Sequence, residues 1–115
     1  DLAILKLESV DNAASLCRAL KLSGSKRPVE AGQEVQKLTA RLLSPQYSQA
    51  TVEEYFLRKQ AEALPLLNGE DPERSMIYLN GPSENGDSGG PIIDASAQVV
   101  GIDSAKGNGG FAVTP

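Results

Sequence analysis

Residues 85–93 read NGDSGGPII, and this stretch is the most informative part of the sequence. Ser88 stands between an Asn-Gly-Asp segment and a Gly-Gly pair, so the backbone around it can adopt the positive φ values of a tight turn. The apolar run at residues 91–93 then predicts a β-strand that leaves the turn. Glycine-rich pairs also occur in plain surface loops, and the strand that follows is what favours a defined turn here.

A serine on such a turn has the setting of a nucleophile for acyl transfer. That chemistry needs a hydroxyl that projects from the backbone and two N–H groups that point at the oxygen where negative charge develops. The N–H groups of Gly86 and Ser88 would fill this role, while Gly89 and Gly90 let the chain turn into the strand. A serine nucleophile also needs a base, usually histidine. The chain contains no histidine.

The rest of the chain is rich in short apolar segments that predict strands. They lie at residues 1–7, 32–40, 75–79, 91–93, 97–102 and 109–114, and glycine-containing turns separate most of them. The pattern predicts an all-β fold with mainly antiparallel strands.

One segment, residues 51–64, predicts a helix. Thr51 and Glu54 have the spacing of a capping box, in which each side chain accepts a hydrogen bond from the backbone N–H of the other residue. Apolar residues follow at helical spacing, and Pro65 would end the helix.

The composition narrows the classes of protein and partner. The chain has 115 residues, which fits one compact domain, and no apolar run approaches the roughly 18 residues of a membrane span. The net charge is −4, and the basic pairs Lys26-Arg27 and Arg58-Lys59 are not interleaved with aromatic residues. Nucleic-acid binding is therefore not expected. The single cysteine, Cys17, excludes an internal disulfide. The acidic residues at 70–73 lack calcium-loop spacing and indicate a solvated turn, so no metal is expected.

The stretch GDSGGP resembles the nucleophile turn of the chymotrypsin/trypsin-like serine proteases, a family that includes the HtrA-like bacterial members. Other stretches agree with that family in order and approximate spacing, namely DLAILKLE at 1–8, AGQEVQKLTA at 31–40, VVGIDSAKG at 99–107 and GGFAVTP at 109–115. The resemblance implies that residues 1–8 are the last strand of a first barrel and that residues 9–31 connect two barrels. Residues 32–115 would then form the second β-barrel, with the helix at 51–64 as an insertion.

Carried over by position, the resemblance implies a role for individual residues. Ser88 would be the nucleophile, Asp1 the carboxylate that orients the base, and Gly86 and Ser88 the donors of the oxyanion hole. Ser104, Ala105 and Lys106 would pair with the substrate backbone as an added strand. The pocket for the side chain before the cleaved bond would be walled by Pro82, Ser83, residues 104–106 and Gly110. The substrate would be a peptide or protein, with neither cofactor nor metal.

The resemblance also bears on specificity. Pro82 would stand at the pocket floor, where an aspartate would select Arg or Lys, so a preference for basic side chains is not implied. Lys106 would narrow the pocket or favour acidic side chains, unless Asp103 beside it neutralises its charge. The missing pocket disulfide points to a bacterial or viral type of protease, and the family implies a secreted, periplasmic or cell-surface location.

The missing histidine leaves several hypotheses open. In this family the histidine lies upstream of the aspartate, in the first barrel, and this chain begins at the aspartate. We therefore expect a serine endopeptidase whose histidine-bearing barrel comes from the same or another chain, and we expect this chain alone to be inactive. The alternatives are Lys106 acting as the base, an inert homologue that binds peptides along residues 104–106, and a plain β-rich interaction domain.

Overall fold

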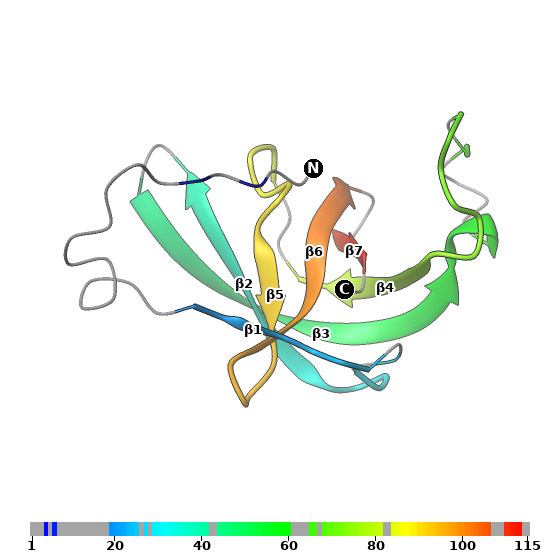
Figure 1. Ribbon diagram of the computed structural model, residues 1–115. Helices are drawn as coiled ribbons and strands as arrows, with labels where there is room; N and C mark the ends of the chain where they lie inside the picture. Colours follow the sequence, from blue (N-terminus) through cyan, green and yellow to red (C-terminus); the bar gives the residue numbers. More distant parts are fainter. Residues whose placement is uncertain are drawn as a thin grey trace.

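The computed structural model describes residues 4, 6, 19–25, 27, 29–41, 44–60, 65, 66, 68–81, 84–106 and 110–113. Within them the chain forms seven β-strands and one short 3-10 helix (Figure 1). The strands are β1 (Lys21–Leu22), β2 (Glu34–Arg41), β3 (Ser44–Leu57), β4 (Ser75–Asn80), β5 (Pro91–Ile93), β6 (Gln98–Lys106) and β7 (Gly110–Val113). The 3-10 helix η1 spans Arg58–Gln60 and directly follows β3.

The strands follow one another around a barrel. Their order is β1-β6-β5-β2-β3-β4-β7, and β7 pairs with β6 as well as with β4. The short strand β1 adds to β6 as a parallel partner, whereas the other described pairings are antiparallel. These pairings confirm the predicted all-β, mainly antiparallel fold. No helix in the described residues has the length and apolar character needed to cross a bilayer.

Aliphatic side chains from five strands fill the interior. Three of them, Ile77, Ile92 and Val100, are completely buried. The core cluster contains Val29, Val35, Ala50, Val52, Ile77, Leu79, Ile92 and Val100. Val29 lies in the segment before β2, which is tied to β3 by hydrogen bonds from Gly32 N–H to the Val52 carbonyl and from Val52 N–H to the Gln33 carbonyl.

The predicted helix at residues 51–64 is wrong. Residues 51–57 belong to β3, and residues 61–64 lie outside the described residues. A β-bulge between Val52 and Glu54 inserts one extra residue, so the core-facing positions of this strand fall at a spacing that imitates a helix. Pairing with β4 from Thr51 to Leu57 outweighs the local capping box, because β-branched and aromatic residues pack well in a strand.

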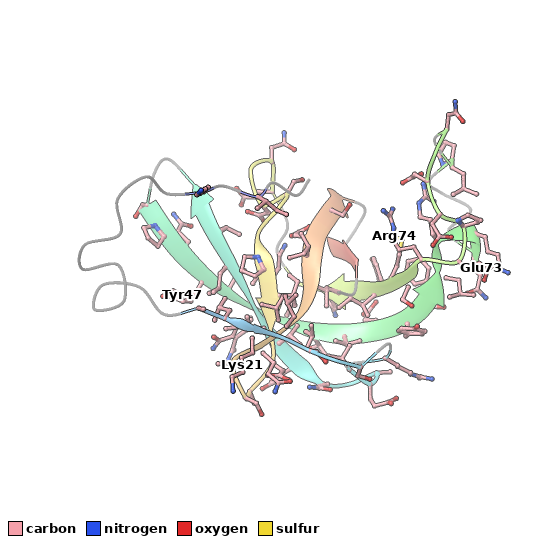
Figure 2. The ribbon with its side chains drawn as sticks, viewed as in Figure 1. Lys21, Tyr47, Glu73 and Arg74 are labelled. Atoms are coloured by element: carbon pink, nitrogen blue, oxygen red, sulfur yellow. The ribbon has the colours of Figure 1, made fainter. Side chains whose placement is uncertain are left out.

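Ion pairs fasten the connection between β3 and β4. The Arg58 side chain is buried, and its Nη2 lies 2.9 Å from Glu70 Oε2 and 2.8 Å from the Pro65 carbonyl oxygen. Arg74 also pairs with Glu70, at 3.1 Å. Figure 2 shows Glu73 and Arg74 at the end of β3 that lies away from Tyr47. The predicted solvated turn at 70–73 is therefore exposed at Asp71 and Glu73 but anchored through Glu70.

The predicted strand at residues 1–7 falls almost entirely outside the described residues. The same holds for most of the predicted connection at 9–31, although β1 lies near its end. The division into a strand of a first barrel, a connection and a second barrel therefore stays a prediction.

Gly90, directly before β5, lies against the backbone of β2. Lys37 pairs with Ile92 in the β2–β5 ladder, and this register brings the backbone of Leu38 against Gly90. A side chain at Gly90 would overlap the Leu38 carbonyl oxygen and would lie 3.0 Å from the Asp87 carbonyl oxygen. Only glycine allows this approach of the two backbones.

We predict that Gly90→Ala destabilises the protein by about 1–3 kcal/mol, because the added methyl group forces β5 away from β2. Urea denaturation of the purified protein measures the change. Gly24→Ala is the matched control, since a methyl group there meets no atom within 4 Å, and it should leave the midpoint nearly unchanged. Equal midpoints for the two variants would show that the strands do not pack as described.

Candidate active site

The turn before β5 is held by its own backbone and by one carboxylate. Asp87 N–H donates to the Glu84 carbonyl at 3.2 Å, and Gly90 N–H donates to the Asp87 carbonyl at 3.0 Å. Glu84 N–H donates to Asp87 Oδ2 at 2.9 Å. Gly86 and Gly89 have φ values of +100° and +86°, which are open to glycine at little cost. The glycines predicted to shape a tight turn thus do so.

Ser88 is exposed at the surface of this turn. It lies on a cavity of about 400 Å³ that is lined by Leu38, Thr39 and residues 86–91. Within the described part of the chain, no hydrogen bond involves the backbone N–H groups of Gly86 or Ser88. The two amides predicted as oxyanion donors are therefore not used by the turn itself.

The strand β6 lies against the other side of the turn. Gly89 N–H donates to the Asp103 carbonyl at 2.7 Å, and Asp103 N–H donates to the Gly90 carbonyl at 2.9 Å. Beyond this contact β6 continues through Ser104–Lys106, with β7 on its far edge. No described strand pairs with residues 104–106 on the edge that faces the turn. Figure 1 shows the turn at the same end of the barrel as the carboxyl ends of β2 and β6.

The predicted site residues are only partly within the described chain. Gly86, Ser88, Ser104 and Gly110 lie in it, together with the backbone of Ala105 and Lys106. Gly110 pairs with Lys106 on β6 and with Leu79 on β4. It therefore lies on the edge of β6 opposite to the edge where the substrate is predicted to pair. Asp1, Pro82 and Ser83 lie outside the described residues, as does the side chain of Lys106.

A buried ion cluster links the turn to both flanking strands. Lys37 on β2, Asp87 in the turn and Asp103 on β6 are 1%, 1% and 2% exposed. Lys37 Nζ lies 2.7 Å from Asp103 Oδ2 and 3.4 Å from Asp87 Oδ2. Both contacts are therefore ion pairs between side chains that are almost completely buried.

Sequence reasoning missed Lys37, and it missed the cavity wall formed by Leu38 and Thr39. A signal was present, because Lys37 follows Val35 by two positions and so falls on the core-facing side of β2. A lysine in the buried phase of a strand implies an anionic partner nearby. Asp103 provides a carboxylate to Lys37, and its predicted effect on the charge of Lys106 stays a prediction, because the Lys106 side chain lies outside the described residues. Within the described residues, no group of three or more His, Cys, Asp or Glu could hold a metal ion.

The fold is similar to that of solved proteases. The inactive form of the Rv3671c protease from M. tuberculosis superposes with a TM-score of 0.69 and 25% identity, over 86% of this chain and 50% of its own length. Its active form gives a TM-score of 0.67 with 27% identity, over 86% of this chain and 44% of its own length. The HtrA-type protease AlgW, solved with a decapeptide, has the same fold at 17% identity, with a TM-score of 0.62 over 84% of this chain and 29% of its own.

This chain therefore spans half the length of these structures or less. Its sequence matches the protein family described as Trypsin over residues 1–113. That match covers nearly the whole chain and agrees with the β-barrel and with the turn around Ser88. The chain belongs to the trypsin family of proteases.

Proposed function

We propose that this chain carries three parts of a serine endopeptidase: the nucleophile, the oxyanion hole and the strand that pairs with the substrate. The observation that carries the proposal is the exposed Ser88 on a turn whose Gly86 and Ser88 amides make no hydrogen bond within the described residues. Two such amides beside a hydroxyl are what the tetrahedral intermediate of acyl transfer requires. The cavity lined by Leu38 and Thr39 leaves room for the substrate at this point.

In the proposed reaction, Ser88 Oγ attacks the peptide carbonyl carbon and forms a C–O bond, while a base accepts the hydroxyl proton. The carbonyl oxygen becomes an oxyanion that accepts hydrogen bonds from Gly86 and Ser88. Collapse of this intermediate breaks the C–N bond, and the same base, now acid, donates the proton to the leaving amine. Water then hydrolyses the acyl-enzyme by the reverse sequence and restores Ser88.

The base is proposed to be a histidine from outside this chain, because the chain contains none. It would belong to a first barrel, either of the same polypeptide or of another, and Asp1 would orient it. The chain by itself would then be inactive.

The substrate is proposed to be a peptide that adds to β6 as an antiparallel strand. Ser104–Lys106 present an edge toward the turn that no described strand occupies, next to the contact between Asp103 and Gly89. Backbone pairing there would place the scissile carbonyl beside Ser88. Pro82, Ser83 and Gly110 would wall the pocket for the side chain that precedes the cleaved bond.

The alternative function is an inert peptide-binding module that uses the same edge of β6. The absence of histidine is the observation that favours it. Both functions need peptide binding, and only the enzyme needs a reactive Ser88, so a probe of serine reactivity separates them.

We predict that a fluorophosphonate probe labels Ser88 in a natural form that contains both this chain and a histidine-bearing first barrel, and leaves this chain alone unlabelled. Intact mass spectrometry measures the adduct. Ser88→Ala should abolish the label, whereas Ser96→Ala, at another exposed serine, should retain it. Failure to label the longer form would leave the binding module as the function. Ser88-dependent labelling of this chain alone would mean that the base lies in this chain and is not histidine.

In the form that contains a histidine-bearing first barrel, we predict that Gly86→Ala slows fluorophosphonate labelling on the order of 100-fold. A side chain at φ +100° forces the Gly86 amide out of line with the oxyanion. Gly69→Ala is the matched control. Gly69 has a φ of +88°, and a methyl group at either glycine meets no atom within 4 Å. Both variants should lose about 1–2 kcal/mol of stability, and only Gly86→Ala should lose reactivity. Equal labelling rates in the two variants would rule out Gly86 as an oxyanion donor.

A further inference from the structure

We propose that Lys37 is a positioning residue. Its buried ammonium group couples the turn that carries Ser88 to Ser104–Lys106, the segment of β6 that would pair with the substrate. The inference rests on the proposed function and extends it to a residue on β2. In the proposed reaction Lys37 acts through Asp87 and Asp103, the two aspartates that directly precede Ser88 and Ser104 in the sequence.

The position of each aspartate supports this coupling. Asp87 is adjacent to Ser88, and Asp103 is adjacent to Ser104. Their Oδ2 atoms lie 3.4 and 2.7 Å from the same Lys37 Nζ. A shift of either carboxylate therefore moves the backbone of the adjacent residue, Ser88 or Ser104, which takes part in the proposed reaction.

Charge explains why the ammonium is needed. Asp87 and Asp103 come from separate segments and are both buried beside Lys37. Without the ammonium, two buried carboxylates would face one another with mutual repulsion and a large desolvation cost. The turn is the easier part to move, because it is an exposed loop whereas Asp103 lies in a strand paired with β7. Ser88 would move with Asp87.

The backbone contacts alone do not replace the ion cluster. Two hydrogen bonds join Gly89 and Gly90 to Asp103, and they fix the end of the turn against β6. They do not fix the carboxylate of Asp87, which also accepts the hydrogen bond from Glu84 N–H that shapes the start of the turn. Lys37 thus connects the start of the turn to β2, and Asp103 connects the same ammonium to β6.

The test compares variants of the form of the protein that reacts with the fluorophosphonate probe. Lys37→Met should slow labelling on the order of 100-fold, since misplacing a reacting group by about 1 Å has an effect of that size. Lys37→Arg keeps the positive charge and should restore most of the rate. Arg58→Met is the matched control, because it removes another buried cation, at the β3–β4 connection, away from Ser88. It should lower the melting temperature and leave the labelling rate unchanged.

A double-mutant cycle tests the coupling itself and does not depend on whether Lys37→Met folds. Asp87→Asn and Asp103→Asn keep the shape of each side chain, and each should slow labelling about tenfold. Two independent tenfold losses would multiply to a roughly 100-fold lower labelling rate. Because both aspartates share Lys37, the labelling rate of the double variant should fall by clearly less than that.

Three results would overturn the proposal. One is a labelling rate in Lys37→Met equal to that of the unmodified protein. Another is an equal loss in Arg58→Met, which would show that any buried cation matters. The third is a strictly multiplicative loss in the double variant, because independent effects leave no role for a shared ammonium. If the unmodified protein were unreactive, the proposed function would fail first. Hydrogen exchange of peptide 84–92 would then decide the positioning role, with faster exchange in Lys37→Met expected and unchanged exchange contradicting it.

Discussion

The buried ammonium of Lys37 is the interaction on which the arrangement of this end of the barrel depends. A charge inside a protein is tolerated only with partners of opposite sign at short distance. Lys37 finds them in Asp87 and Asp103, which come from the turn and from β6. The ion cluster therefore requires β2, the Ser88 turn and β6 to converge at one place. The aliphatic core and the close approach at Gly90 bring their backbones to that place.

This convergence explains why the proposed chemistry lies where it does. The turn places Gly86 and Ser88 in the wall of a cavity, and β2 supplies the Leu38 and Thr39 side of that cavity. On the other side, β6 has an edge at Ser104–Lys106 that no described strand occupies, and the proposed substrate peptide would pair there. The membership in the trypsin family and the similar barrels of solved proteases agree with the β-barrel fold. Of the groups that the proposed reaction needs, the histidine base is the one that this chain does not contain.

Local signals in the sequence predicted the turn and most strands, because glycine positions and apolar alternation are set by near neighbours. β5 was predicted with its observed bounds, and the strand at 75–79 is extended by one residue in β4. The helix at 51–64 failed because a bulge near Glu53 broke the alternation on which strand prediction relies. Lys37 could be suspected from its core-facing phase, but its partners lie far along the chain and only the folded barrel brings them together.

A crystal structure of the reactive form with a phosphonate covalently bound to Ser88 would test the central claim most directly. The account predicts a phosphonyl oxygen about 3 Å from both the Gly86 and the Ser88 amide nitrogens, with Lys37 Nζ still between the carboxylates of Asp87 and Asp103. A phosphonyl oxygen directed away from these amides, or a Lys37 side chain turned away from the two aspartates, would contradict it.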